Sequence, residues 1–160
     1  MEIRDARPED APAACQVLRR SITELCIADH HNDPAILQQW LANKTPEIVR
    51  SWIENPNNTM LVAIDGAAIL AVGSVTRAGE ITTNYVSPDA RFHGVSRTMM
   101  TELEARTRQR GVTQCTLVST ETAHKFYQAL GYTETGPAQC KFGTDASYPM
   151  TKNLIQNPTI

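Results

Sequence analysis

The chain has 160 residues, of which 41% are apolar, and its formal net charge is -2 at pH 7. That length suffices for one ordinary hydrophobic core, so we expect a single domain over residues 1–160. The charge is neither basic enough to indicate a general nucleic-acid binder nor acidic enough to indicate a disordered chain.

Helical patterns dominate the first third of the chain, after one short strand. Residues 2–6, EIRDA, are typical of a strand, and residues 7–26 follow with a proline and two acidic residues at a helix start. Residues 34–55 predict two short helices, because the apolar spacing is interrupted where Thr45 and Pro46 suit a new helix start.

The hydrophobic period changes to that of strands in the middle of the chain. Short turns containing glycine separate three strand-like runs, at residues 59–64, 67–75 and 80–86. Turns of this kind join antiparallel neighbours, so an antiparallel meander is predicted.

The last third predicts a helix, a strand, a helix and a strand, at residues 94–111, 113–119, 121–132 and 147–154. The order of all elements indicates one α/β domain with a mixed, mostly antiparallel sheet flanked by helices.

Cysteine usage and hydropathy indicate a reduced, cytoplasmic protein. The cysteines form no C-x-x-C pair and no Cys/His cluster with zinc spacing, so we expect no disulfide framework, no metal site and buried thiols. The first residues lack the apolar segment of a signal peptide, and the most apolar stretch, residues 60–72, is too short to span a bilayer.

The turn at residues 87–94 combines a proline, positive charge and a glycine just before a helix. The first N–H groups of a helix have no partner within it and attract anions. Gly94 leaves room for a phosphate, and Arg91, His93 and Arg97 add donors. The spacing matches neither a nucleoside-triphosphate loop nor a dinucleotide fingerprint, so another diphosphate ligand is predicted, with an ordinary basic loop as the alternative.

Two segments, YVSPDARFHGVSRTMM and TAHKFYQALGY, resemble motifs of the GNAT superfamily of N-acetyltransferases. The stretch YVSPDARFHGVSRTMM is similar to that superfamily's acyl-CoA pyrophosphate loop, in which [Q/R]-x-x-G-x-[G/A] opens a helix after a strand end and a proline. Further along, TAHKFYQALGY is similar to its A-x-x-F-Y-x-x-x-G-[F/Y] segment. The resemblance implies a GNAT-like fold with acetyl-CoA as the acetyl-donor cosubstrate and no metal.

The resemblance also implies which residues bind the cosubstrate. A strand backbone would pair with the pantetheine arm, and the loop and helix start would hold the diphosphate; these residues are Tyr85, Val86, Arg91, Phe92, His93, Gly94, Val95, Ser96 and Arg97. His93 replaces the arginine usual in the superfamily, and histidine is largely neutral at pH 7. Thr120 stands where asparagine is common.

Tyr127 and Glu80 are implied as catalytic residues. Tyr127 matches the tyrosine that lies near the CoA sulfur in many members and would protonate the leaving thiolate; packing on an apolar helix face is the alternative. Glu80 resembles in position the glutamate base of the histone-acetylating branch; an ordinary hairpin-end charge is the alternative. The backbone N–H of Val86 would stabilise the oxyanion.

These features together predict transfer of an acetyl group from acetyl-CoA to a primary amine of a small molecule or peptide, by direct attack in a ternary complex. A non-catalytic acyl-CoA-binding or regulatory module is the alternative, because His93 and Thr120 depart from the pattern. Asp29 and Asp33 would attract a cationic amine, unless they belong to a merely solvated loop. No nucleic-acid or membrane partner is expected, and a homodimer is left open.

Overall fold

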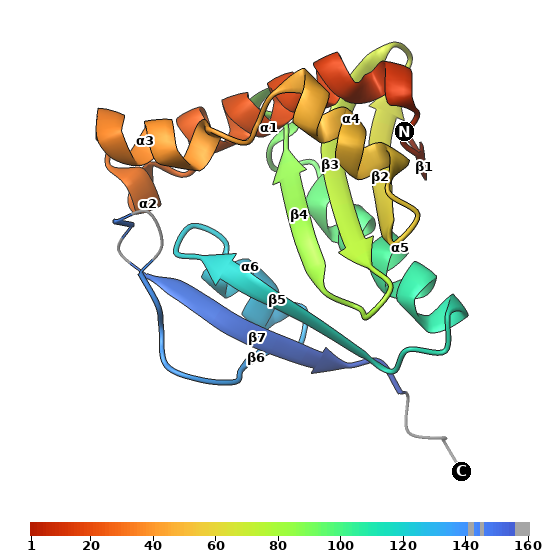
Figure 1. Ribbon diagram of the computed structural model, residues 1–160. Helices are drawn as coiled ribbons and strands as arrows, with labels where there is room; N and C mark the ends of the chain where they lie inside the picture. The colour runs from red at the N-terminus through yellow and green to blue at the C-terminus, as the bar shows by residue number, and fades with distance from the viewer. Residues whose placement is uncertain (141–142, 145, 156–160) are drawn as a thin grey trace.

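The computed structural model describes residues 1–140, 143–144 and 146–155 (Figure 1). In chain order the elements are β1 (Glu2–Asp5), η1 (Pro8–Asp10), α1 (Ala11–Leu25), α2 (Ile27–His30), α3 (Pro34–Leu41), α4 (Pro46–Glu54), β2 (Asn58–Asp65), β3 (Ala68–Thr76), β4 (Ile81–Val86), η2 (Pro88–Ala90), α5 (Val95–Gln109), β5 (Gln114–Thr120), α6 (His124–Ala129), β6 (Thr133–Glu134) and β7 (Ser147–Asn153). No helix in these parts of the chain has the length and hydrophobicity that a membrane crossing requires.

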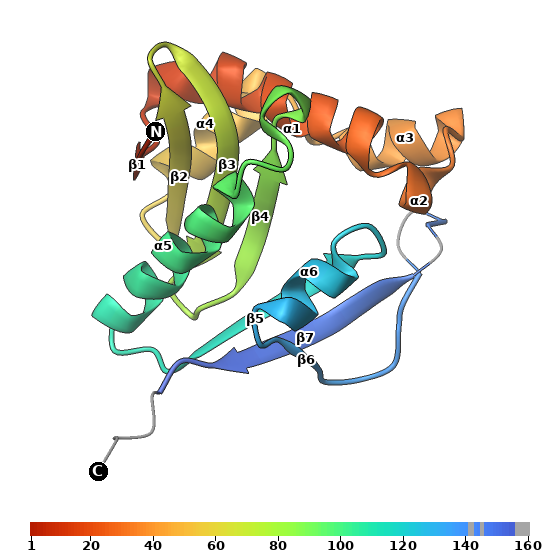
Figure 2. The same ribbon diagram turned by 180° about the vertical axis from the view of Figure 1, so that it is seen from behind.

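Four antiparallel strands form the larger sheet, in the order β1-β2-β3-β4. Helix α5 covers one face of this sheet, and α1 with α4 covers the other (Figure 2). Leu61 of β2 belongs to a buried cluster with Met99 and Leu103 of α5, whereas the next residue, Val62, belongs to a cluster with Leu18 of α1. Because successive side chains of a strand face opposite ways, burial of both faces explains the nearly continuous apolar runs in the sequence.

The smaller sheet has the strand order β5-β7-β6, and α6 packs beside it. The two sheets touch where β4 begins: Glu80 and Thr116 form a parallel bridge, and the Thr116 N–H donates to the Gly79 carbonyl over 3.0 Å. Beyond this point β4 and β5 diverge (Figure 1). Gly79 is needed there, because its φ is +89° and a Cβ would overlap the carbonyl of Gln114.

A partly buried ion pair joins α5 to the smaller sheet near this junction. Glu104 of α5 is 5% exposed and accepts hydrogen bonds from Lys152 Nζ at 3.0 Å and from the Tyr132 hydroxyl at 2.8 Å. Lys152 pairs with Cys115, the residue before Thr116. β4 and β5 diverge from this junction and leave a gap between the two sheets. At the junction, where the gap is closed, the sheets are therefore held together by side chains as well as by backbone.

The predicted mixed α/β fold is confirmed, although its strands form two antiparallel sheets where a single sheet was expected. Thr45 caps α4 as expected, because its Oγ1 accepts from the Ile48 N–H over 3.3 Å. The sequence did not predict α2 and β6, which are too short to show a hydrophobic period. One expectation about the cysteines was wrong: Cys140 is exposed, because it lies in the polar connection between β6 and β7.

Candidate active site

The turn between β4 and α5 contains two residues in the left-handed region. Gly94, directly before the helix, has φ of 73°, and Phe92 has φ of 67°, which residues with a side chain rarely adopt. A Cβ built on Gly94 would meet no heavy atom within 4 Å. Ser87 fixes the beginning of the turn, because its Oγ accepts from the Asp89 N–H over 3.2 Å. The turn therefore leaves open space directly in front of the helix.

No side chain caps the start of α5. The N–H groups of Val95, Ser96 and Arg97 lie in the first helical turn, and none of them hydrogen-bonds to another described residue. Arg91 and Arg97 are exposed, and no ion pair between described residues involves either of them. Free backbone donors and unpaired cations thus surround the same open space, an arrangement that suits a phosphate or diphosphate.

One edge of β4 is open along the gap between the sheets. Its other edge pairs with β3, where Val72 lies opposite Tyr85. The N–H of Ser87 also points toward β3 and donates to the Leu70 carbonyl over 2.7 Å. Because successive N–H groups of a strand point to opposite edges, the N–H of Val86 points into the gap. This open edge can pair with an extended ligand as if the ligand were a further strand.

Tyr127 of α6 lies inside the gap and is 7% exposed. Burial raises the pKa of Tyr127 to about 12, although the hydrogen bond from Asn84 opposes this rise. The Tyr127 hydroxyl accepts that bond from Asn84 Nδ2 over 3.2 Å, so its own proton remains available to a ligand. The predicted catalytic tyrosine is thus placed with its hydroxyl against the strand that carries the open edge.

The sequence motifs did not indicate Asn84 as a site residue. Its Oδ1 is buried and has no hydrogen-bond partner among the described residues. Buried polar atoms are seldom left unpaired unless a ligand or water satisfies them. Asparagine is rare in strands, so its presence within β4 is the sequence signal that could have indicated a site residue.

A cavity of about 360 Å³ brings these groups together. It is lined by side chains of α1, β4, the turn, the start of α5 and α6, including Cys26, Asn84, Tyr85, Val86, Arg91, Phe92, Gly94, Val95, Ser96, Arg97, Phe126 and Tyr127. Every residue predicted for the cosubstrate lines this cavity except His93, which is exposed on the turn beside it.

Glu80 lines a different cavity, of about 280 Å³, together with Tyr85 and Thr120. Tyr85 and Thr120 also line the cavity that contains Tyr127. A smaller space of about 50 Å³ in the gap is lined by both of these residues and by Tyr127. The structure therefore puts the two predicted catalytic residues in neighbouring cavities that share walls, and not side by side.

The acidic residues between the first helices have structural partners. Asp29 is 1% exposed and accepts from the N–H groups of Glu121 at 2.7 Å and Thr122 at 3.1 Å. Asp33 caps α3 by accepting from the Ala35 N–H at 2.9 Å. Carboxylates occupied in this way do not support the predicted attraction of a cationic amine, and Asp29 instead anchors the turn that leads into α6.

Comparison with known proteins agrees with this geometry. Residues 26–154 match the family model described as an acetyltransferase (GNAT) domain. The search of curated proteins found no match.

Solved structures share the fold at low sequence identity. A GCN5-related N-acetyltransferase from Rhodopseudomonas palustris is 23% identical, with 96% of this chain and 95% of that chain covered and a TM-score of 0.84. PaiA N-acetyltransferase from Thermoplasma acidophilum, solved with coenzyme A, is 18% identical over 95% and 98% of the two chains, with a TM-score of 0.81. Aminoglycoside 6′-N-acetyltransferase from Enterococcus faecium is 16% identical over 99% and 100%, with a TM-score of 0.73. With its family match over most of its length, the chain belongs to the GNAT family of acetyltransferases.

Proposed function

We propose that this protein transfers an acetyl group from acetyl-CoA to a primary amine of a small molecule or peptide, by direct attack in a ternary complex. The observation that carries the proposal is one cavity that contains the uncapped start of α5, the open edge of β4 and the hydroxyl of Tyr127. Acetyl-CoA, whose thioester is joined to a diphosphate by an extended arm, can use all three features. The similar structure of PaiA was solved with coenzyme A, which supports the same ligand here.

The proposed cosubstrate site has a distinct task for each part of its wall. The first-turn N–H groups of α5 and the side chains of Arg91 and Arg97 hold the diphosphate, and Gly94 lets it approach the backbone. The backbone of Tyr85 and Val86 pairs with the pantetheine arm along the open edge. His93 lies outside the cavity wall, so its replacement of an arginine removes a peripheral charge.

The proposed chemistry uses the groups at the far end of the same cavity. The amine nitrogen forms a bond to the acetyl carbon, and the carbon–sulfur bond breaks. The N–H of Val86 stabilises the negative charge that develops on the carbonyl oxygen. Tyr127 donates its hydroxyl proton to the leaving sulfur and regains a proton from solvent. Glu80 takes the proton lost by the amine through water, from the neighbouring cavity.

A direct transfer is favoured over an acetyl-enzyme with cysteine. Cys26 is the thiol in the cavity wall, and burial raises its pKa to about 12. The reactive thiolate is therefore nearly absent at neutral pH.

Release of free thiol from acetyl-CoA in the presence of a panel of amines tests the proposal. Tyr127→Phe is expected to lower kcat by about a hundredfold or more, because general acid catalysis contributes about that much, and to leave CoA affinity unchanged. Tyr148→Phe is the matched control, since it removes a hydroxyl that donates to Glu121 outside these cavities. CoA binding without turnover of any amine would instead favour a non-catalytic acyl-CoA-binding module.

Glu80→Gln tests the base separately. The expected result is a fall in kcat/KM of about tenfold to a hundredfold with unchanged affinity for CoA, because the carboxylate acts on the amine alone. An unaltered rate would remove Glu80 from the mechanism and leave water as the base.

A further inference from the structure

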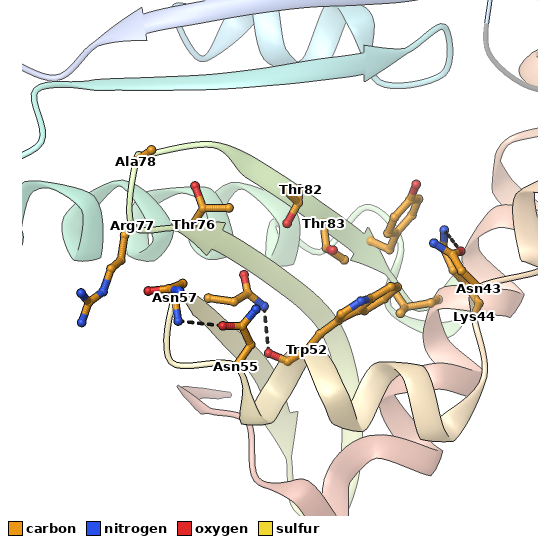
Figure 3. Close-up of a pocket in the computed structure, with 13 residues that line it drawn as sticks. Asn43, Lys44, Trp52, Asn55, Asn57, Thr76, Arg77, Ala78, Thr82 and Thr83 are labelled. Atoms are coloured by element: carbon orange, nitrogen blue, oxygen red, sulfur yellow. Dashed lines mark hydrogen bonds between the residues drawn. The ribbon is translucent and has the colours of Figure 1, made fainter.

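A third cavity, of about 590 Å³, lies on the face of the larger sheet that α1 and α4 cover (Figure 3). The indole of Trp52 and the side chain of Thr83 border its centre, and Lys44 and Arg77 lie at opposite ends. Carboxamides make up much of the remaining wall, at positions 43, 55, 57 and 58. The cavity thus has a cation at each end, and its wall combines carboxamides with apolar surface such as that of Trp52.

The charged side chains in the described wall of this cavity are all positive. Its described wall contains Lys44 and Arg77 but no carboxylate. Lys44 Nζ donates to Asn43 Oδ1 over 2.8 Å, and no ion pair between described residues involves Lys44 or Arg77. Lys44 is half-buried, and this loss of hydration lowers the pKa of its ammonium group. An anionic group placed here would restore favourable interactions that the ammonium lost on burial.

The cavity adjoins the proposed transfer site. It shares Thr82 and Tyr85 with the cavity that Glu80 lines, and it shares Tyr85 with the cavity that contains Tyr127. A molecule whose amine lies beside Tyr85 can therefore extend along β4 into the cationic cavity.

We infer that the amine acceptor also carries a carboxylate or phosphate group, and that this group binds in the cavity beside Lys44, with Arg77 available to longer acceptors. The inference rests on the proposed function and names the substrate class of that same site. A purely cationic amine is disfavoured, because its further ammonium groups would face Lys44 and Arg77 without a carboxylate in the described wall. A polyamine or an aminoglycoside, which carries several ammonium groups, is therefore disfavoured as the acceptor.

Matched acceptors test the inference, since members of each pair differ in the anionic group alone. Alanyl-alanine is compared with its C-terminal amide, glucosamine 6-phosphate with glucosamine, and spermidine serves as the polycation. The anionic member of at least one pair is expected to have a kcat/KM at least about tenfold higher, equivalent to about 1.4 kcal/mol. The first pair reports a carboxylate and the second a phosphate. Equal rates within both pairs, or a preference for spermidine, would overturn the inference.

Charge-removing variants locate the effect. Lys44→Gln is expected to lower kcat/KM for the anionic member much more than for the neutral member, and Arg77→Gln is expected to do so only for an acceptor long enough to reach Arg77. Arg50→Gln is the matched control, because Arg50 is exposed on α4, pairs with Glu54 and does not line the cavity. An equal loss for both members of a pair in Lys44→Gln would contradict a charge-reading role.

Failure of the inference and failure of the proposed function give different results. If CoA binds but no amine releases thiol, the proposed activity fails, and the same pairs are then compared by thermal shift in the presence of CoA. A larger shift with the anionic member, lost in Lys44→Gln, still supports the inference. Equal shifts overturn it.

Discussion

At the scale of single residues, the candidate site depends on a hydrogen bond between Asn84 and Tyr127. The amide of Asn84 donates to the phenol over 3.2 Å, so the phenol keeps its proton for another acceptor. The buried Oδ1 of Asn84 remains without a partner among the described residues. We infer that this oxygen accepts from a bound ligand or a water, because buried acceptors are rarely unpaired.

The pKa of Tyr127 leads to a prediction about pH dependence. Burial raises this pKa from 10.0 to about 12, so the hydroxyl stays protonated at every pH well below about 12. The rate should therefore rise as the amine loses its proton and should not fall again between about pH 7 and about pH 10. A pH–rate profile at saturating acetyl-CoA checks this. A falling limb centred near pH 10 in the native protein, absent from Tyr127→Phe, would contradict the assigned pKa.

The site residues differ in how visible they are in the sequence. The turn with Gly94 and the helix with Tyr127 could be predicted, because a family motif keeps its residues at fixed spacing. The role of Asn84 could not, since its partner lies 43 positions further along the chain. The structural role of Asp29 could not be predicted for the same reason, because the residues that donate to it are 92 and 93 positions away.

At the scale of elements, Asp29 connects α2 to the turn between β5 and α6. Asp29→Asn replaces two acceptor oxygens with one, so one of the N–H groups of Glu121 and Thr122 loses its partner. We expect a lower melting temperature and a lower kcat, because the turn positions the helix of Tyr127, with no increase in the KM for the amine. Thermal unfolding and steady-state kinetics measure both effects. A rise in the amine KM alone would restore a direct acceptor role for Asp29.

The ion pair between α5 and β7 gives a second prediction at this scale. Glu104→Leu leaves Lys152 without its carboxylate and Tyr132 without its acceptor. Because Lys152 is partly exposed and Tyr132 is buried, the main loss is that of the acceptor for the Tyr132 hydroxyl, and the free energy of unfolding is expected to fall by about 1–3 kcal/mol. Glu102→Leu on the exposed side of the same helix is the control, and its pair with Arg106 at 3.4 Å should matter little. Urea denaturation measures the free energy of unfolding of the two variants. Equal decreases would contradict the stabilising role assigned to Glu104.

The elements themselves were largely predictable, and their separation into two sheets was not. The helices and the meander have clear hydrophobic periods and glycine turns in the sequence. The divergence of β4 and β5 depends on the pairing of β5 with β7, from Gln114 opposite Asn153 to Thr120 opposite Ser147. Local patterns do not contain such long-range pairings, so the sequence indicated a sheet without showing where it opens.

At the scale of the whole molecule, three cavities meet at Tyr85, near the opening between the sheets. The proposed cosubstrate cavity and the two cavities proposed for the amine share Tyr85 in their walls. Direct transfer requires such a meeting of the thioester and the amine. The shared wall supports the proposed ternary complex, and the cationic cavity is the feature from which we infer the class of acceptor.

The central claim is that the start of α5 and its turn bind the diphosphate of CoA. Calorimetric titration of the folded protein with CoA, acetyl-CoA and pantetheine tests this most directly. We predict one site for CoA and acetyl-CoA, and at least about tenfold weaker binding of pantetheine, which lacks the diphosphate and the phosphorylated adenosine. Replacing Arg91 and Arg97 together by Gln should weaken CoA binding and leave pantetheine unaffected. No association of CoA or acetyl-CoA at millimolar concentration would contradict the account.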